Sequence, residues 1–433
     1  MPSRPGSAGF FILWDTPTYI ETGKACPGTR RQGGKRDLNL IGKLSRRRKK
    51  ACGTAAAVLM AVALVFAGTA GNAGTAAATP PPPENHAKAA ALIDVTSGRI
   101  LFSQRGDEPM KIASLTKIMT AIVAIEHGNL DDVVTVSRRA AGMEGSSLYL
   151  KPGEKMTLHN LLYGLMLRSG NDAAMAIAEH VGGSVEGFVY LMNRKAEELG
   201  LMNTHYANPH GLDHPDHYMS ANDLARLTAY ALHNPVFQSI VRTRVKTAPN
   251  PFEPWDYKWI NKNKMLYMYE GADGVKTGYT RLANRTLVSS ATRNGQQLAA
   301  VTLNDGDDWA DHRRLLDYGF RHFPLQTVIR KGELAPGTPY AAAETFRYPF
   351  ADGERERLEA RIELTPSGTV PHKLGYRGKL VFLLDGQTIG TVVLKEPSAV
   401  TWEEEENGET AAAWTSLKPE TRRSMAQFLR QSV

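Results

Sequence analysis

The sequence predicts an α+β protein in which an antiparallel sheet is covered by helices, followed by a small all-β domain. Three observations lead to this prediction. Strand patterns lie at both ends of residues 85–323, helical patterns fill the middle of that segment, and alternating apolar residues dominate residues 324–400. Strands at both ends with helices between them are typical of an antiparallel sheet with a helical covering.

The chain begins with residues 1–78, which we interpret as a leader that contains a secretory signal. A positive run (46–50) precedes an apolar run (55–68) that is short for a membrane span, and small residues follow. Gly71-Asn72-Ala73 and Ala76-Ala77-Ala78 both resemble a signal-peptidase cleavage site. The pattern therefore predicts export, with an uncleaved membrane anchor as the alternative.

Charge and cysteine content bound the function of the exported part. Residues 1–78 contain 12 basic residues (Lys and Arg) and 3 acidic residues. Residues 79–433 contain 40 basic and 41 acidic residues. The net charge of +8 thus belongs to the leader, and no basic surface for nucleic acid is expected. Cys26 and Cys52 also lie in the leader, so the exported protein is expected to be stabilised by its core without disulfides.

The predicted catalytic domain, residues 85–323, overlaps a Pro-rich spacer over 79–88. Two apolar runs around a Thr-Ser-Gly turn predict a β-hairpin over 89–104. A helix that contains Ser114 follows and ends at residues 127–129, and a polar stretch connects it to the next helix. Four further helices are predicted over 157–170, 171–182, 184–200 and 220–234, the last three each with an Asn or Ser as N-cap.

The end of the domain changes from helical to alternating periodicity. Strands are predicted over 274–280, 285–293 and 297–305, and Asn294-Gly295 is a strong signal for the turn between the last two. A helix over 308–323 closes the domain.

The remaining sequence divides into a β-rich domain over 324–400 and a tail over 401–433. The tail contains an acidic linker (403–409) and an amphipathic stretch (419–433). Apolar side chains on one face with arginines beside them are typical of a helix in a membrane interface, although such a helix could also pack on the β-domain or fray. The residues are Met425, Phe428, Leu429 and Val433, with Arg422, Arg423 and Arg430.

Three short motifs lie in order on these elements. Ser114 and Lys117 are three residues apart and so share one helix face, Ser-Gly-Asn (169–171) lies between two helices, and Lys-Thr-Gly (276–278) lies on a strand. Each motif alone has an ordinary structural explanation, such as a helix stop, a cap or a surface lysine. Their order and placement favour a serine nucleophile with a lysine base.

Together, the motifs resemble those of penicillin-binding proteins and class A β-lactamases. The chain is similar to the D-alanyl-D-alanine carboxypeptidases of the low-molecular-mass penicillin-binding protein family, over about residues 85–400. The segments 208–215 (NPHGLDHP) and 315–320 (LLDYGF) also resemble that family. The Glu-x-x-Leu-Asn that a class A β-lactamase uses for deacylation does not follow Ser169, so fast β-lactam hydrolysis is not expected.

The resemblance implies a β-lactamase/transpeptidase-like fold and a serine peptidase, located at the outer face of the cytoplasmic membrane or in the cell wall. It would remove the terminal D-alanine from peptidoglycan stem peptides that end in D-Ala-D-Ala, without cofactor or metal, and β-lactams would acylate it. Ser114 would be the nucleophile, Lys117 its base and Ser169 the relay of a proton to the leaving amine. The expected substrate-binding residues are Asn171, Lys276, Thr277, Gly278 and Tyr279.

The residues themselves support this mechanism. Burial and a second cation, Lys276, would lower the pKa of Lys117 enough for it to act as a base. The backbone N–H groups of Ser114 and Tyr279 are expected to bind the oxyanion, as in the family. The strand over 275–280 could pair with an extended peptide.

Other functions fit parts of the pattern. His205, His210, His214 and His217, with Asp213 and Asp216, could bind a metal, but they lie on a Pro/Gly loop without helical spacing, which favours a solvated loop at the rim of the site. A non-catalytic wall-binding or β-lactam-sensing protein, a D,D-endopeptidase and a weak β-lactamase would all share the three motifs. C-terminal contact with the membrane is a further expectation from the amphipathic stretch.

Overall fold

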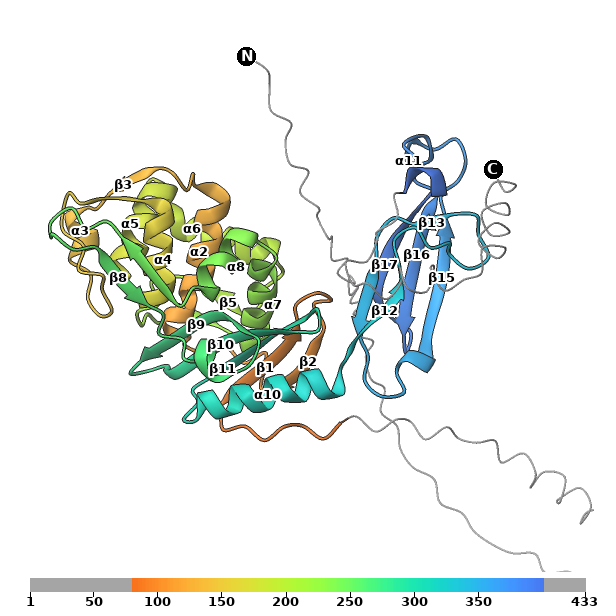
Figure 1. Ribbon diagram of the computed structural model, residues 1–433, viewed down its shortest axis with the longest axis horizontal. Helices are drawn as coiled ribbons and strands as arrows, with labels where there is room; N and C mark the ends of the chain where they lie inside the picture. Colours follow the sequence, from red (N-terminus) through yellow and green to blue (C-terminus); the bar gives the residue numbers. More distant parts are fainter. Residues whose placement is uncertain (1–79, 401–433) are drawn as a thin grey trace, which may run out of the picture. The chain divides into compact units, whose positions relative to one another are not determined.

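The computed structural model describes residues 80–400, and its first part is a five-stranded antiparallel sheet with the strand order β2-β1-β11-β10-β9 (Figure 1). The first two strands form the predicted hairpin and the last three come from the end of the predicted domain. The strands are β1 (Ala89–Asp94), β2 (Ile100–Gln104), β9 (Ala272–Thr280), β10 (Asn284–Arg293) and β11 (Gln296–Leu303).

The strands from the two ends of this part form one sheet because β1 pairs antiparallel with β11, from Ala89 opposite Leu303 to Asp94 opposite Leu298. The turn between β10 and β11 is at Asn294 and Gly295, whose φ angles of 50° and 74° lie in the left-handed region that an Asn-Gly hairpin turn requires. The predicted α+β fold with an antiparallel sheet under helices is therefore confirmed.

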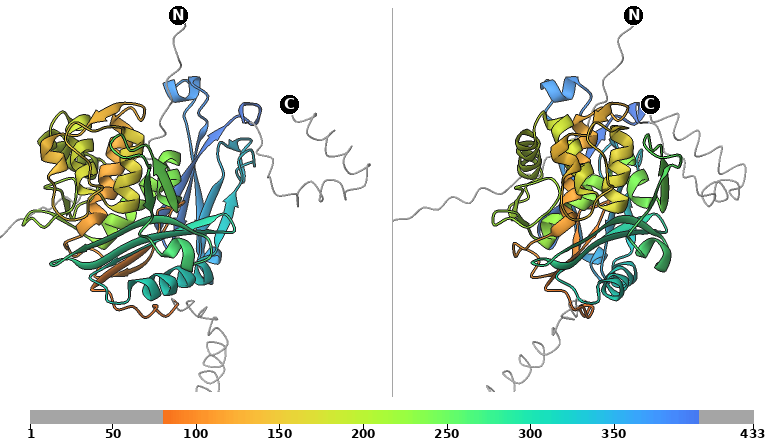
Figure 2. Two further views of the ribbon diagram at one scale, coloured as in Figure 1. Left: turned by 60° about the vertical axis from the view of Figure 1, so that its left-hand side comes forward. Right: turned by 90° about the vertical axis from the view of Figure 1, so that its left-hand side faces the viewer.

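Both faces of the sheet are covered, which explains why β1 is a continuous apolar run (Figures 1 and 2). Ala91 and Ile93 belong to the core beneath the helical layer, whereas Leu92 packs with Leu315 and Leu316 of α10 (Asp308–His322) on the opposite face. Alternate side chains of one strand thus stabilise two separate cores.

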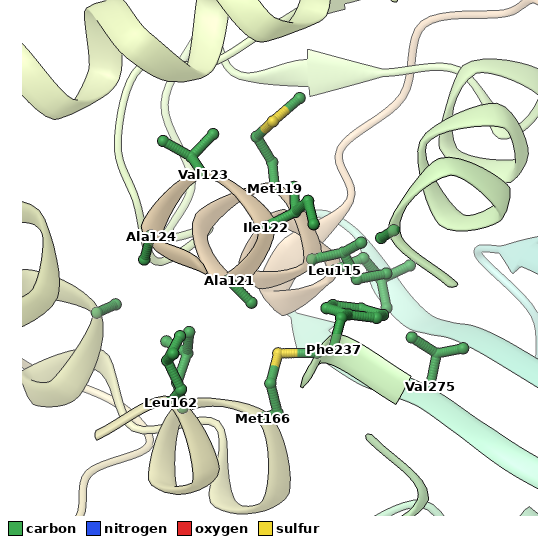
Figure 3. Close-up of a cluster of buried hydrophobic side chains, with 14 of the residues drawn as sticks. Leu115, Met119, Ala121, Ile122, Val123, Ala124, Leu162, Met166, Phe237 and Val275 are labelled. Atoms are coloured by element: carbon green, nitrogen blue, oxygen red, sulfur yellow. The ribbon is translucent and has the colours of Figure 1, made fainter. Parts of the chain in front are cut away.

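The helical layer is organised around α2 (Lys117–His127), whose first eight residues are all buried. Met119, Ile122 and Val123 of α2 belong to the same core cluster as Leu162 of α4, Phe237 of α8 and Val275 of β9. Met119 and Val123 project from the side of the helix opposite Leu162 and Met166, so α2 is packed on opposite sides (Figure 3). This packing holds the helix that carries Lys117 in one position. The other helices are α3 (Arg138–Ala141), α4 (Leu158–Tyr163), α5 (Asn171–Gly182), α6 (Val185–Glu198), α7 (Ala221–Leu232), α8 (Pro235–Arg242) and α9 (Met265–Met268).

Several connecting segments contain structure that the sequence analysis did not predict. The polar stretch after α2 holds α3 and a two-stranded sheet of β3 (Val133–Thr135) and β4 (Lys155–Thr157). The segment between α8 and β9 holds a second small sheet of β7 (Val245–Ala248) and β8 (Tyr257–Ile260). A third pair, β5 (Thr204–His205) and β6 (Tyr218–Met219), brackets the histidine-containing loop.

The β-rich segment has its own hydrophobic core, formed by Ile329, Leu380, Phe382 and Val392 among others. Four of its strands form an antiparallel sheet with the order β13-β17-β16-β15, and β12 pairs with β14. The elements are β12 (Leu325–Ile329), β13 (Ala341–Ala342), β14 (Phe346–Pro349), β15 (Leu358–Leu364), α11 (Val370–Lys373), β16 (Gly378–Leu384) and β17 (Gln387–Lys395).

The predicted leader over 1–78 and the tail over 401–433 lie outside the described residues. Within residues 80–400, none of the helices has the length and apolar character needed to cross a bilayer.

Candidate active site

Ser114 lies in a 3₁₀ turn, Ala113–Thr116, that leads directly into α2 at Lys117. The prediction of an α-helix around Ser114 is therefore wrong in detail, since the helix begins three residues later. A 3₁₀ turn has three residues per turn, so side chains at i and i+3 are eclipsed. Lys117 Nζ accordingly lies 3.0 Å from Ser114 Oγ, and the predicted meeting of the two side chains is confirmed.

The backbone of the turn is strained next to Ser114. Ala113 has a φ of 49°, which a non-glycine residue rarely adopts and which costs free energy. Gly211, with a φ of 86°, approaches the Ala113 carbonyl so closely that any side chain there would clash with it. The position of Ser114 is thus fixed by contacts from the loop over 208–215.

Lys117 is completely buried and is surrounded by three oxygen acceptors. Its Nζ donates to Ser114 Oγ, to Asn171 Oδ1 at 2.7 Å and to the His210 carbonyl at 2.5 Å. Burial lowers the pKa of Lys117 well below its ordinary value, and the positive charges of Lys276 and Lys262 lower it further. A lysine in this environment can be a neutral amine and accept a proton from Ser114.

The second motif follows a break in the helix at its active-site end. After α4 the chain forms a π-helical turn, Gly164–Arg168, and Ser169 then adopts a left-handed conformation with a φ of 67°. Among the described residues, the buried Ser169 Oγ has no hydrogen-bond partner. An unpaired buried hydroxyl is costly, and such strained, unsatisfied groups are concentrated at functional sites.

Asn171 connects Lys117 to the neighbouring loop. The expected N-cap role is wrong, because Gly170 is the N-cap of α5, Asn171 is its first helical residue, and the Asn171 side chain makes no capping bond. Its Oδ1 accepts from Lys117, its Nδ2 donates to the Glu144 carbonyl at 2.6 Å, and its backbone N–H donates to the Ser146 carbonyl at 2.7 Å.

The third motif lies on β9, at the edge of the sheet. Gly278 lets this strand approach the 3₁₀ turn, because a Cβ at Gly278 would lie 3.2 Å from the Ser114 backbone nitrogen and 2.5 Å from Thr286 Oγ1. The strand therefore brings the backbone of Tyr279 close to that of Ser114. The Tyr279 side chain itself is exposed.

Lys276 of β9 is buried, and its Nζ donates to the carbonyl of Thr277 at 2.7 Å. Burial, with a smaller effect of Lys262, lowers the pKa of Lys276 to about 7. In the free site Lys276 is thus close to its own titration midpoint at neutral pH. A carboxylate beside it would raise its pKa and stabilise the ammonium form.

Three residues of the site were missed by the sequence analysis. Lys262 influences the pKa of both motif lysines, and its Nζ donates to Ser146 Oγ at 3.2 Å. Asp172, completely buried, binds the loop that Asn171 contacts. His210 supplies the carbonyl that binds Lys117. Asp172 adjoins the Ser-Gly-Asn motif and His210 lies in the quoted family segment, so only Lys262 lacked a sequence signal.

The expectation of a solvated histidine loop is wrong for two of its members. His210 and His217 are buried, and burial lowers the pKa of each ring to about 3. The His217 ring bonds Thr116 Oγ1 at 2.7 Å and the Ala207 backbone N–H at 3.1 Å, so it supports the turn that carries Ser114.

Within residues 80–400, the group of side chains with metal-ligand spacing is His86, Asp307 and Asp311, at the start of α10. The Arg314 guanidinium contacts both aspartates and lies 3.4 Å from the His86 ring nitrogen. A cationic side chain therefore already lies against these carboxylates and offsets part of their charge, which disfavours a metal ion there.

Comparisons with known proteins agree with this geometry. Residues 75–307 match the family model of peptidase family S11, D-alanyl-D-alanine carboxypeptidase. The D-alanyl-D-alanine carboxypeptidase DacF of Bacillus subtilis is 34% identical over 73% of this chain and 83% of its own length. The D-alanyl-D-alanine carboxypeptidase DacC of Escherichia coli is 33% identical over 76% of this chain and 86% of its own length.

Solved structures show the same similarity. Penicillin-binding protein 5 from Haemophilus influenzae, at 28% identity, matches with a TM-score of 0.61 over 75% of this chain and 98% of its own. A DD-transpeptidase of Streptomyces K15, at 32% identity, matches with a TM-score of 0.53 over 55% of this chain and 100% of its own. From its three motifs, its fold and these relatives, the chain belongs to the D-alanyl-D-alanine carboxypeptidase family of serine peptidases, within the low-molecular-mass penicillin-binding proteins.

Proposed function

We propose that this protein removes the terminal D-alanine from peptidoglycan stem pentapeptides through an acyl-serine intermediate. The observation that carries the proposal is the 3.0 Å contact between Ser114 Oγ and the Nζ of Lys117, whose pKa is lowered by burial. A hydroxyl is a weak nucleophile until a base takes its proton, and a buried neutral lysine is such a base.

In the acylation step, Ser114 Oγ attacks the carbonyl carbon of the penultimate D-alanine and its proton passes to Lys117. The carbonyl oxygen becomes an oxyanion and accepts hydrogen bonds from the backbone N–H groups of Ser114 and Tyr279. The C–N bond then breaks, and Ser169 relays the proton from Lys117 to the leaving amine of D-alanine. The Ser169 hydroxyl has no other hydrogen-bond partner among the described residues, which suits it to this relay. Water subsequently hydrolyses the acyl-serine ester and regenerates Ser114.

Binding of the peptide follows from the position of β9 at the sheet edge. An edge strand has unpaired backbone groups, so an extended stem peptide can add to it as a further strand. Lys276 and the Thr277 hydroxyl would bind the terminal carboxylate, Gly278 would leave room for the peptide, and the Asn171 amide would bind a peptide amide of the substrate.

The test compares the exported protein with its Ser114→Ala variant on a D-Ala-D-Ala pentapeptide and on a fluorescent penicillin. We expect D-alanine release and a labelled serine only when Ser114 is present, with the acyl-enzyme visible by mass spectrometry. Stable acylation without D-alanine release would instead indicate the non-catalytic sensor, and full labelling of Ser114→Ala would refute the assignment of the nucleophile.

The remaining parts of the chain complete the proposal. Residues 85–323 would form the catalytic domain and residues 324–400 the β-domain, with export directed by the leader over 1–78. Residues 419–433 would contact the outer face of the cytoplasmic membrane. N-terminal sequencing of exported material should begin after residues 73–78, and deletion of 419–433 should abolish binding to anionic vesicles.

A further inference from the structure

Tyr149 combines two features that rarely occur together. Its side chain is 83% exposed, the second-highest exposure among the large apolar side chains within residues 80–400, and its backbone has a φ of 65°. The left-handed region is unfavourable for a residue with a large side chain, and it persists only where the surroundings hold it. An aromatic ring kept in solvent by a strained backbone is a candidate for ligand contact.

The backbone around Tyr149 is held by the buried carboxylate of Asp172. This carboxylate accepts hydrogen bonds from the N–H groups of Leu148 at 2.9 Å and Leu150 at 3.1 Å, on either side of Tyr149. It also accepts from Ser147 Oγ at 2.7 Å, and Ser147 Oγ in turn accepts from the Tyr149 N–H at 2.9 Å. The ring therefore extends from a rigid loop.

A second anchor follows directly along the chain. The buried carboxylate of Glu154 accepts from the Lys151 N–H at 2.9 Å and from the Tyr257 hydroxyl at 3.0 Å. The Lys151 ammonium lies 4.6 Å from the centroid of the Phe252 ring, on the exposed connection between β7 and β8. These contacts fix the loop at both ends and attach it to a neighbouring segment that also exposes aromatic side chains.

The same loop is continuous with the active site. The Ser146 carbonyl, three residues before Tyr149, accepts the Asn171 N–H at 2.7 Å. The other side of Asn171 binds Lys117, which contacts Ser114. Three residues of extended chain span at most about 10 Å. The Tyr149 backbone therefore lies within about 10 Å of the Ser146 carbonyl that binds Asn171.

We propose that Tyr149 binds the sugar that carries the stem peptide, by stacking its ring against the apolar face of the N-acetylmuramic acid ring. This inference rests on the proposed function. Three stem residues separate that sugar from the D-alanine that acylates Ser114, so the sugar would lie outside the motif residues, in the surroundings of the site that this loop borders. A tyrosine offers a flat apolar face and a polar hydroxyl at its edge, which suits a sugar ring, whereas the acidic residues of the stem require cations.

The experiment measures kcat and KM for D-alanine release from two substrates with the same stem, the free pentapeptide and N-acetylmuramoyl-pentapeptide. Tyr149→Ala removes the ring, and Tyr149→Gly removes it with a residue that adopts the positive φ without strain. Tyr149→Phe retains the ring. Tyr190→Ala is the matched control, since Tyr190 is also an exposed tyrosine but lies on α6.

We expect the preference for the sugar-bearing substrate, as the ratio of the two kcat/KM values, to fall roughly five- to tenfold in both ring-removing variants, through KM. Tyr149→Phe should retain the preference, and Tyr190→Ala should not change it. In a Ser114→Ala background, calorimetric binding of the two substrates should show the same loss without turnover.

Other outcomes would overturn the inference. An unchanged ratio would show that the ring does not contact the sugar, and an equal loss with both substrates would assign it to the peptide instead. If the unaltered protein releases no D-alanine from either substrate, the proposed function fails. The calorimetric measurement still tests the inference in that case, because the affinity for the sugar-bearing substrate should fall on loss of the Tyr149 ring regardless of turnover.

Discussion

Two buried lysines in one site need opposite charge states for the proposed reaction. Lys117 must be neutral to take the proton of Ser114, whereas Lys276 must be charged to bind the terminal carboxylate. Burial lowers the pKa of both lysines, and nearby cations lower each pKa further. Both Lys276 and Lys262 lower the pKa of Lys117, against a smaller opposing effect of Asp172. Within residues 80–400, Lys262 is the one cation that lowers the pKa of Lys276.

These charge states predict a bell-shaped pH dependence of kcat/KM. Activity should rise with pH as Lys117 becomes neutral and fall above about pH 7 as the free enzyme loses the charge on Lys276. Because arginine stays charged, Lys276→Arg should move the descending limb well above pH 7 while retaining part of the activity. Lys117→Arg should abolish acylation, since a guanidinium cannot accept the proton.

Rates of D-alanine release between pH 5 and 10 would measure both limbs for each variant. An alkaline limb that stays near pH 7 in Lys276→Arg would contradict the assignment to Lys276. In kcat, which reports the complex, the same limb should lie at higher pH because the bound carboxylate raises the pKa of Lys276.

At the scale of elements, the sequence predicted what is long and periodic. The hairpin of β1 and β2, the strands β9 to β11 and the helices α5 to α7 have strong apolar patterns and turn or cap residues that depend only on neighbouring residues. The short pairs β3–β4 and β7–β8 have three or four residues per strand, which is too few for a period to be recognised.

The motifs were predictable as a set, but their local geometry was not. Asn171 resembles an N-cap, yet its side chain binds Lys117, from a helix 54 positions earlier, because a buried amine needs an acceptor. Ser169 adopts a left-handed conformation directly after the buried π-helical turn Gly164–Arg168, which no local sequence signal indicates. Tertiary contacts thus determine the conformations of Asn171 and Ser169 against their local propensities.

The loop held by Asp172 gives a prediction for a whole element. Asp172→Asn replaces one acceptor oxygen by an amide donor, so either the Leu150 N–H, which donates to Oδ2, or the Ala173 N–H, which donates to Oδ1, loses its partner. We expect a loss of about 1–3 kcal/mol in the free energy of unfolding. Acylation should also slow, because the same loop accepts the Asn171 N–H.

Urea unfolding and the rate of penicillin acylation would measure the two effects. Asp131→Asn, at an exposed carboxylate, is the matched control and should change neither. If Asp172→Asn acylates as fast as the unaltered protein, the loop does not position the second motif.

For the whole molecule, the site exists only because distant parts of the sequence meet. Ser114 comes from a 3₁₀ turn before the central helix, Ser169 from a helix junction, and Lys276 from the edge strand of the sheet. The segment between β5 and β6 supports the turn around Ser114, because the His210 carbonyl binds Lys117 and the His217 ring binds Thr116. A third buried histidine, His312, lies between α10 and the sheet and bonds Ser289 and Thr302.

These three buried histidines predict how stability depends on pH. Burial lowers the pKa of each to about 3, whereas the unfolded chain takes up protons near pH 6.5. The stability is therefore fully present above about pH 6.5 and is lost as the pH falls toward 3. Asp305 acts in the opposite sense, because burial raises its pKa to about 6 and the folded state binds a proton there first.

Through these four groups, the unfolded state binds about two protons more than the folded state between about pH 4 and 6, which contributes about 3 kcal/mol per pH unit. His312→Asn should reduce that slope by about one proton, or about 1.4 kcal/mol per pH unit, whatever it does to the stability at pH 7. The control His127→Asn removes an exposed ring at the end of α2 and should leave the slope unchanged. Urea unfolding at intervals from pH 7 to pH 4.5 gives both slopes, and equal slopes for His312→Asn and the unaltered protein would show that His312 takes up its proton in the folded state.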